Sequence, residues 1–411
     1  MVDVASESSV DRVALQKRTL TTLRLSQVPG QAATAGMIAV VTLLASDMLG
    51  SDRLAGLGSA SFTIGVAFAA IPLAAYMRRH GRRKGLSRAL LLGVVGSLIA
   101  ATGGELRWFP LLLLGLLAFG AGHAATLQQR YVAADLAPAT EQGTAIAAIV
   151  WVGALGAILG PLLTPFEKSV ARRLGLDELV GPFLFAAVLF LIAAAVVWVR
   201  LRPDPLEVIG EIDSHAERVH PFKTIRSAAT EIRASAGAKL GLASMAITQA
   251  AMVGVMTMTP PHMKDHGQAT LSAVVIAVHI AGMFAFAPLV GRFADRAGPI
   301  RAVQVGAVVL GVGTIASVIA GYVPALIFVG LFLLGLGWNF GLIGGMTLLT
   351  GSVPSSAKVE VQGAGDLTLS LCGALAALAS GFVKASFGFH ILANLATVLA
   401  AGLLVFAWYT A

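Results

Sequence analysis

The sequence predicts an all-α polytopic membrane protein with twelve transmembrane helices in two pseudo-symmetric six-helix halves. Its 411 residues are 57% hydrophobic and only 12% charged, whereas soluble domains carry about 25% charged residues. The apolar residues run in long blocks and do not alternate with polar ones, as they would in an outer-membrane β-barrel. Several landmarks of the first half recur in the second. A water-soluble enzyme is therefore excluded.

The lengths of the apolar blocks give the number of spans. A helix rises 1.5 Å per residue, so about 20 apolar residues cross a hydrocarbon core of about 30 Å. Twelve blocks qualify: 32–50, 56–77, 87–103, 108–129, 143–164, 181–200, 238–259, 270–290, 301–322, 324–348, 363–383 and 388–409. They divide the chain into a cytoplasmic N-terminal tail (1–31), an N-terminal six-helix half (32–200), a cytoplasmic central linker (201–237) and a C-terminal six-helix half (238–411).

The basic residues predict the orientation. With the N-terminus in the cytoplasm, 22 of the 29 Lys and Arg residues fall in segments on the inner side, as the positive-inside rule requires. Both termini are then cytoplasmic, in a bacterial-type inner (plasma) membrane. The net charge of +8 is spread over several loops, so it reports topology and contact with anionic lipid, and no nucleic-acid partner is expected. A monomer without a resident cofactor is expected, and the single cysteine, Cys372, allows no internal disulfide.

Three landmarks recur at nearly constant distance and indicate duplication of a six-helix unit. Gly81 recurs as Gly298, 217 positions later. The other pairs are Gly120-x-Gly122 with Gly335-x-Gly337, at 215 positions, and Gln142-Gly143 with Gln362-Gly363, at 220, each followed ten residues after its Gly by Gly153 or Gly373. This is the architecture of transporters that move two repeats about a site near the bilayer midplane.

The loop after the eighth span reads Gly291-Arg292-Phe293-Ala294-Asp295-Arg296-Ala297-Gly298, and it resembles the loop signature of the major facilitator superfamily. The resemblance covers essentially the whole chain and implies that family's fold. In it, Asp295 and Arg296 would form a charge latch with neighbouring helix ends. The first half departs from the signature, because Ala74 and Arg78 stand where the family usually has Gly and Asp.

Span five contains Gly153, Gly156 and Gly160-Pro161. This run resembles the superfamily's antiporter motif, which would give Gly160 and Pro161 a role in coupling or gating. A helix kinked by proline and packed closely against a neighbour explains the same residues. Both interpretations stay open at the level of sequence.

Spans seven and eight carry a pattern of thioether and imidazole side chains. Met252 with Met256, and His279 with Met283, are i,i+4 pairs, so each pair lies on one helix face. Met245 extends the first stripe, and Gln249 shares its helix. Depths counted at 1.5 Å per residue predict rungs with Met256 outermost, then Met252 beside His279, then Met245 beside Met283.

Thioether and imidazole suit Cu(I), so the pattern predicts a copper-binding pathway. Methionine is also a common packing residue, and a lone intramembrane histidine is more often a hydrogen-bonding or proton-handling group, so core packing competes with the metal site. The paired motif resembles that of CcoA-like copper importers, a branch of the superfamily to which riboflavin transporters are close. That resemblance implies Met252, Met256, His279 and Met283 as metal ligands.

Three further polar residues are candidates for coupling or gating, because ionisable groups inside a membrane are costly and usually functional. Asp366 lies near the inner end of span eleven, where an N-terminal acid favoured by the helix dipole is the alternative. His123 lies in mid span four, at the position that Trp338 takes in the repeat, and Asn339 follows Trp338.

No enzyme signature and no phosphate-binding GxxxxGK[ST] loop occurs in the chain. The sequence thus predicts a secondary active transporter that works by alternating access, with copper uptake through the Met/His site as the leading substrate hypothesis. The alternatives are a proton-coupled exporter of hydrophobic drugs or metabolites and a riboflavin-type importer of small molecules. A third class is a sensor or assembly factor that transports nothing.

Overall fold

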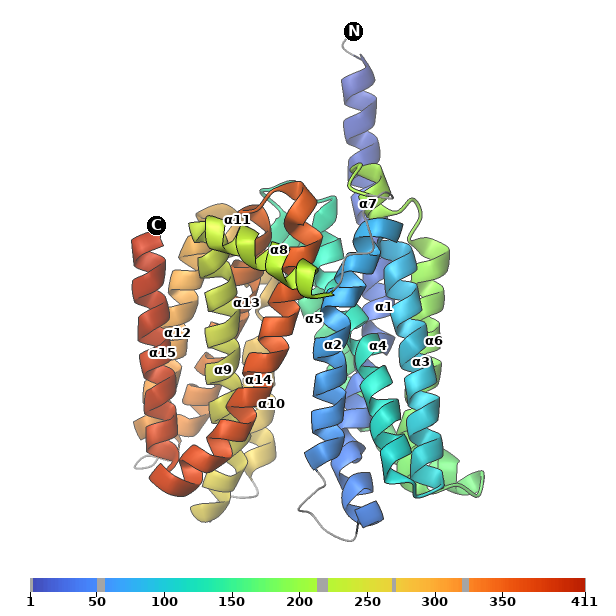
Figure 1. Cartoon of the computed structure of the whole chain (residues 1–411). Helices are drawn as coiled ribbons and strands as arrows, with labels where there is room; N and C mark the ends of the chain where they lie inside the picture. The colour runs from blue at the N-terminus through green and yellow to red at the C-terminus, as the bar shows by residue number, and fades with distance from the viewer. Residues whose placement is uncertain (1–2, 50–55, 213–220, 268–270, 320–324, 411) are drawn as a thin grey trace. The chain divides into compact units, whose positions relative to one another are not determined.

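The computed structural model describes residues 3–49, 56–212, 221–267, 271–319 and 325–410. Residues 1–2 of the predicted tail, residues 213–220 of the predicted linker and the ends of some predicted spans lie outside these ranges. Within the described residues the secondary structure is helical (Figure 1). The α-helices are α1 (Asp3–Leu49), α2 (Gly56–His80), α3 (Arg82–Glu105), α4 (Phe109–Asp135), α5 (Gln142–Arg173), α6 (Gly181–Arg200), α7 (Pro205–Val208), α8 (Pro221–Ala234), α9 (Ala236–Asp265), α10 (Ser272–Phe284), α11 (Ala287–Ala297), α12 (Pro299–Ile319), α13 (Leu326–Gly351), α14 (Lys358–Phe387) and α15 (Phe389–Thr410).

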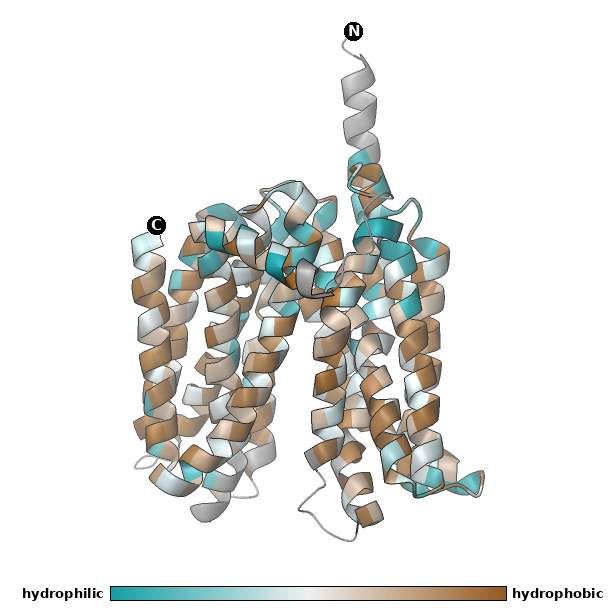
Figure 2. Cartoon of the chain, in the orientation of Figure 1, coloured by the Kyte–Doolittle hydropathy of each residue, from teal (hydrophilic) through white to brown (hydrophobic). Residues whose placement is uncertain are grey.

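Twelve membrane spans are confirmed: the described residues contain twelve helical segments that are long and apolar enough to cross a bilayer. A helix satisfies all of its internal backbone hydrogen bonds, which is why helices can span a hydrocarbon core. Figure 2 shows hydrophobic residues along the lengths of the helices and hydrophilic residues gathered toward helix ends. The chain is a multi-pass membrane protein.

The first and eighth spans differ from the predicted boundaries. Helix α1 begins at Asp3, so most of the predicted tail is helix. One of its polar side chains is held by a tertiary contact: Gln16 Nε2 donates to the Ala133 carbonyl over 2.7 Å. Hydropathy does not register such contacts. The eighth span is two helices, α10 and α11, which meet around Phe286. Proline lies at the start of α11, where its missing N–H costs nothing.

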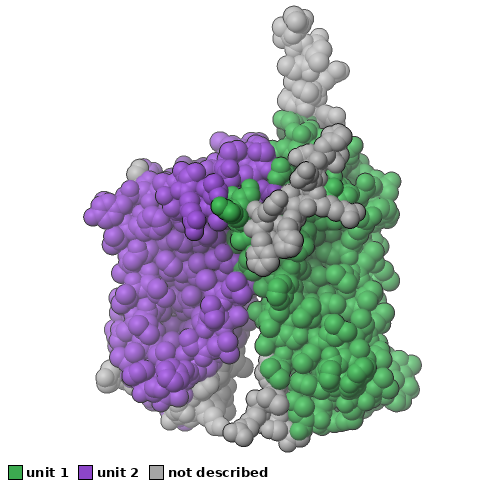
Figure 3. All heavy atoms as spheres, viewed as in Figure 1, with its two compact units in different colours: residues 1–137, 152–227, 362–367 green, residues 138–151, 228–361, 368–411 purple. Residues whose placement is uncertain are grey.

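The chain forms two compact units, coloured separately in Figure 3. The first comprises residues 1–137, 152–227 and 362–367, and the second comprises 138–151, 228–361 and 368–411. The units therefore differ from the predicted halves, because the start of α5 belongs to the second unit and a short part of α14 belongs to the first.

The helix pairings in the two units support the predicted duplication. In the first unit α4 packs against α2 and α3, while α6 packs against α1 and α3. In the second unit α13 packs against α10 and α12, while α15 packs against α9 and α12. Gly81 and Gly298, 217 positions apart, both have positive φ, 89° and 93°. The same pairing scheme thus occurs twice.

Small residues bring corresponding helices into close contact. A Cβ atom built on Gly115 of α4 would lie 2.6 Å from the Ala100 Cα of α3. One built on Gly337 of α13 would lie 2.7 Å from the Leu310 Cα of α12. Because lipid tails are as apolar as the helices, association relies on such close van der Waals contact.

Candidate functional site

Asp366 of α14 is the centre of a buried polar cluster in the first unit. Arg130 Nη2 of α4 lies 2.5 Å from Asp366 Oδ1, and Gln128 Nε2 donates to Asp366 Oδ2 over 3.0 Å. All three residues are buried. Both carboxylate oxygens are therefore occupied by donors from one helix. Asp366 lies within α14 and is not an exposed N-terminal acid, because α14 begins eight residues earlier, at Lys358.

A second ion pair, between a buried arginine and a partly buried aspartate, lies in the same unit. Arg82, at the start of α3, is fully buried. Its Nε and Nη2 donate to the two carboxylate oxygens of Asp135 over 2.8 and 3.1 Å, and Nη2 also donates to Gln362 Oε1 over 2.7 Å. This bidentate geometry is the strongest form of an arginine–carboxylate contact. In the sequence, Arg82 was predicted only to be one of the basic residues on the cytoplasmic side.

Asp295 contacts a helix end in the second unit, as the charge latch would require, and its role as a latch stays a prediction. The Asp295 carboxylate accepts hydrogen bonds from the Gly143 and Thr144 backbone N–H groups, at 2.8 Å each. These are unpaired donors of the first turn of α5, where a negative charge is favoured. The Arg296 side chain is exposed and takes no part in this contact.

Gly160 and Pro161 lie in the part of α5 that packs on α1. A Cβ atom on Gly160 would lie 2.6 Å from the Gly36 backbone nitrogen, whereas Pro161 is exposed. One turn earlier, Gly156 also faces α1, 2.8 Å from the Gln31 Cβ by the same measure. The structure shows close packing of this part of α5 on α1, which is one of the two interpretations of the glycine run. The antiporter interpretation stays a prediction.

His279 of α10 is fully buried and turned toward α13 in the second unit. Its Nδ1 lies 2.8 Å from the Leu331 carbonyl oxygen, so Nδ1 carries the proton. Its Nε2 is buried and has no hydrogen-bond partner among the described residues. The ring is therefore held in one tautomer, with a lone pair facing the interior.

The predicted innermost rung is wrong. Met245 of α9 packs at Gly345 of α13, with its Cγ 3.0 Å from a Cβ built there, whereas Met283 packs at Gly335, with its Cγ at 3.1 Å. These contact points lie ten residues apart on one helix, about 15 Å along its axis. Met245 and Met283 are thus separated, because α9 and α10 bring them into contact with α13 at positions far apart along its axis.

The two remaining methionines differ in exposure. Met252 is buried and Met256 is partly exposed, and neither is shown beside His279. Among the described residues, no group of three or more His, Cys, Asp or Glu side chains could hold a metal ion. Any copper site in this chain would therefore depend on thioethers together with His279.

Gln249 and Asn339 are polar groups near Trp338 in the second unit. Trp338 Nε1 donates to Gln249 Oε1 over 2.7 Å, and Trp338 contacts Phe284 edge to face with ring centroids 5.9 Å apart. Asn339 is fully buried, and neither of its amide atoms has a hydrogen-bond partner among the described residues. A buried amide without hydrogen-bond partners destabilises the folded protein. The Asn339 amide is therefore suited to bind a ligand or a water molecule.

The first unit contains a counterpart of this arrangement. His123 of α4 contacts Phe62 of α2, with ring centroids 5.5 Å apart, as Trp338 contacts Phe284. Gln27 Nε2 lies 3.1 Å from a Cβ built on Gly153, and Gln249 Nε2 lies 2.9 Å from one built on Gly373. These similar contacts support the predicted correspondences of His123 with Trp338 and of Gly153 with Gly373.

Glu167 is a buried acid that sequence reasoning missed. It lies on α5 beyond the predicted end of span five, it is buried, and its Oε2 has no hydrogen-bond partner among the described residues. Residues 160 and 167 are seven apart, so the face of α5 that carries Gly160 continues to Glu167. That periodicity was the available signal.

Comparison with known proteins identifies the family. Residues 30–377 match the Major Facilitator Superfamily. The chain is 37% identical over 390 residues to the uncharacterized MFS-type transporter YdeG of Bacillus subtilis, covering 94% of this chain and 90% of that protein. It is 27% identical over 379 residues to the riboflavin transporter RfnT of Brucella anthropi, covering 91% of each.

A solved structure shows the same fold. The crystal structure of the transporter FucP in the outward conformation superposes with a TM-score of 0.73 at 16% sequence identity, over 95% of this chain and 98% of FucP. With twelve apolar helices and two similarly paired units, and with a family match over most of its length, this chain is a member of the Major Facilitator Superfamily, a secondary transporter and not an enzyme.

Proposed function

We propose that this protein couples the movement of a small polar organic solute to that of protons, with Asp366 as the proton-carrying group. The observation that carries the proposal is the buried cluster of Asp366, Arg130 and Gln128. A carboxylate is retained inside a membrane protein at a considerable free-energy cost, and such groups commonly belong to ion pathways. We propose operation in a bacterial-type inner membrane, as a monomer with both termini in the cytoplasm.

Protonation of Asp366 would alter the contact between α4 and residues 362–367. The ion pair with Arg130 is favourable only while the carboxyl is charged, and breaking a buried pair leaves an uncompensated charge. Binding of one proton therefore changes the free energy of the arrangement in which α4 holds this part of α14. A bias of this kind is what proton coupling requires, since an equilibrium moves only by a difference in free energy between its states.

A hydrogen-bonding heteroaromatic solute of the riboflavin class is the substrate that we propose. The resemblance to RfnT over 91% of both chains supports it. Two side chains also support it. Trp338 has an aromatic ring, and the buried Asn339 amide has a hydrogen-bond donor and an acceptor that are both without a partner among the described residues. Flavin rings stack on aromatic groups and carry donors and acceptors at their edges.

Copper uptake is the second candidate, and the geometry of His279 favours it. Metal-binding histidines usually give the second ring N–H to a carbonyl or carboxylate, which orients the free nitrogen. His279 has this arrangement, with Nδ1 at the Leu331 carbonyl and Nε2 without a partner. Export of hydrophobic drugs rests on the Gly160-Pro161 motif alone, which close packing also explains.

One uptake assay separates the two substrates. Proteoliposomes containing the wild type should accumulate radiolabelled riboflavin, and Asn339→Ala should lower the apparent affinity about tenfold through lost hydrogen bonds. Asn394→Ala, on the exposed face of α15, is the matched control. A parallel arm measures uptake of Cu(I), with His266→Ala, a change at an exposed histidine, as the control. If the wild type and His266→Ala take up Cu(I) and His279→Ala does not, copper replaces riboflavin as the proposed substrate. Uptake of neither probe contradicts both substrates.

The coupling role has its own test. In Asp366→Asn, accumulation of the transported solute driven by an imposed pH gradient should vanish, while exchange of labelled for unlabelled solute across equal pH persists. Glu141→Gln, at an exposed carboxylate between α4 and α5, should behave like the wild type. Gradient-driven accumulation that survives in Asp366→Asn would show that another group carries the proton.

A further inference from the structure

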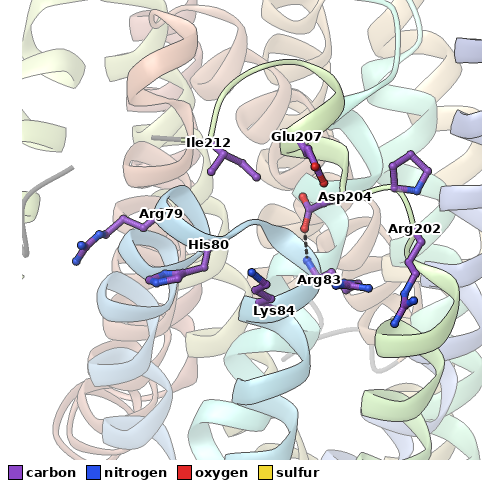
Figure 4. A pocket seen from close by; sticks show the side chains of 9 residues that line it. Arg79, His80, Arg83, Lys84, Arg202, Asp204, Glu207 and Ile212 are labelled. Atoms are coloured by element: carbon purple, nitrogen blue, oxygen red, sulfur yellow. Dashed lines mark hydrogen bonds between the residues drawn. The ribbon is translucent and has the colours of Figure 1, made fainter. Parts of the chain in front are cut away.

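A basic pocket lies at one end of the first unit, where the turn between α2 and α3 meets the start of the linker. Its volume is about 770 Å³, and its walls include four cationic side chains, Arg79, Arg83, Lys84 and Arg202. In Figure 4 the α2–α3 turn forms one side of the pocket, and the segment from Arg202 to Ile212 arches over the other. The pocket is remote in sequence from Asp366 and from the Met/His residues.

The carboxylates at this site are outnumbered by the cations. Asp204 accepts from the backbone N–H groups of Arg82 and Arg83, at 3.1 and 2.8 Å, and from that of Leu206 at 3.0 Å. Both of its oxygens are therefore engaged by backbone N–H groups at the starts of α3 and α7. Glu207 is the other acid in the wall, and it is exposed. The wall thus holds four cationic side chains and two carboxylates, a net positive charge.

The four cationic side chains are not engaged in ion pairs among the described residues, so their N–H donors are available to a ligand. Within the part of the chain that the structure describes, no ion pair involves Arg79, Arg83, Lys84 or Arg202. Arg79 Nε is buried without a hydrogen-bond partner. Guanidinium groups recognise phosphate through paired N–H donors, and lysine adds a mobile positive charge.

The surroundings of Arg83 place the pocket at headgroup depth. The Arg83 guanidinium carbon lies 4.7 Å from the centre of the Trp198 ring, and Trp198, near the end of α6, is 45% exposed. Exposed tryptophans collect at the level of the lipid headgroups. Basic pockets between helices on the cytoplasmic side are suited to anionic headgroups.

We propose that this pocket binds a phosphate-bearing anion, and that in the membrane the phosphate belongs to an anionic phospholipid. The same chemistry would admit a soluble phosphate from the cytoplasm, so the experiment has an arm for each source. The proposal is independent of the transported solute, because none of the pocket residues belongs to the groups assigned to transport.

The test uses the purified full-length protein in neutral detergent. Binding of phosphatidylglycerol and cardiolipin is measured by native mass spectrometry, with phosphatidylcholine as reference, and binding of inorganic pyrophosphate by calorimetry. The variant Arg79→Gln/Lys84→Gln/Arg202→Gln should lose about fivefold in affinity for each charge removed. The control Arg233→Gln/Lys239→Gln/Arg301→Gln removes three exposed cations outside the pocket and should change affinity less than twofold.

Selective loss of anionic lipid in the pocket variant supports the lipid, and selective loss of pyrophosphate binding supports the soluble source. Equal loss in both variants, or no preference of the wild type for anionic ligands, overturns the proposal. Thermal unfolding without ligand establishes that each variant folds. If the triple variant does not, the single change Lys84→Gln, at an exposed residue in the first turn of α3, gives the same comparison against Lys239→Gln.

Discussion

Arg82 shows how differently two cations of one loop can behave. Arg82 is fully buried and holds Asp135 and Gln362, whereas Lys84, two residues later, is exposed in the basic pocket. The positive-inside rule counts both in the same way. Burial decides the difference: a charge removed from water must be paired, whereas an exposed one is free to meet a ligand.

The change Arg82→Gln should therefore destabilise the protein strongly. It leaves the partly buried Asp135 carboxylate, 8% exposed, without its arginine partner, and the loss of one partner of a fully buried pair costs about 3–5 kcal/mol in other proteins, which is the upper bound here. Adding Asp135→Asn should recover part of the loss, since the unpaired charge is gone. Thermal unfolding in detergent measures both, with Arg88→Gln at an exposed site as control. A double variant as unstable as the two single losses added together would show that the pair is not coupled.

At single positions, sequence reasoning located polar residues but not their partners. Asp366 and Asp295 were predicted as functional groups, and both hold defined contacts. Their donors lie on α4 and at the start of α5, more than 150 positions away in each case. No local pattern identifies such partners, because the packing of distant helices brings them together.

Helices α3 and α4, and likewise α12 and α13, depend on glycine where they touch. The contacts at Gly115 and Gly337 leave no room for a side chain. Such contacts replace the hydrophobic effect, which offers little between helices in lipid. Gly115 and Gly337 belong to corresponding helices of the two units, and each allows its helix to approach the neighbouring helix closely.

Leucine at either glycine should separate the helices. For Gly115→Leu and Gly337→Leu we expect a destabilisation of about 1–3 kcal/mol or more from overpacking, seen as a lower Tm in detergent. Gly402→Leu is the matched control, because nothing lies within 4 Å of a Cβ atom built on that glycine of α15. An unchanged Tm in all three variants would mean that the close approach contributes little.

Helix number was predictable from hydropathy, whereas helix ends were not. The twelve blocks of apolar residues correspond to the twelve spans. Helix α1 nevertheless starts at Asp3, and α5 continues to Arg173 and carries the buried Glu167. Hydropathy averages register neither the hydrogen bond of Gln16 to the Ala133 carbonyl nor the burial of Glu167.

At the scale of the whole molecule, the duplication visible in the sequence is also visible in the packing. The offset between repeats predicted that His123 corresponds to Trp338, and each contacts a phenylalanine of the second helix of its repeat. What the offset did not predict is the unequal division of the chain, with 138–151 in the second unit and 362–367 in the first. That division follows from contacts such as those of Asp295 with Gly143 and of Arg130 with Asp366, which cross the boundaries of the repeats.

The predicted orientation is directly testable, because Cys372 is the single cysteine. In a Cys372→Ser background, Leu174→Cys should react with a membrane-impermeant maleimide in intact cells, since the inside count of basic residues places it outside. Glu141→Cys should react only after the cells are permeabilised. Both positions are exposed in the structure. The reverse pattern would invert the topology and place the basic pocket on the outer side.

The cap that Asp295 places on α5 differs in kind from the contact between Arg82 and Asp135. Asp295 binds main-chain N–H groups, which every residue except proline supplies. Position 144 can therefore change during evolution without losing the cap, whereas position 143 must stay Gly, because a Cβ atom there would lie 2.8 Å from Asp295 Oδ1. Arg82 and Asp135 recognise each other through side chains, so a change in one requires an answering change in the other. Across a set of homologues, the first contact should leave an acid conserved at position 295 and glycine at position 143, with position 144 free to vary, and the second should leave a pair of columns that vary together.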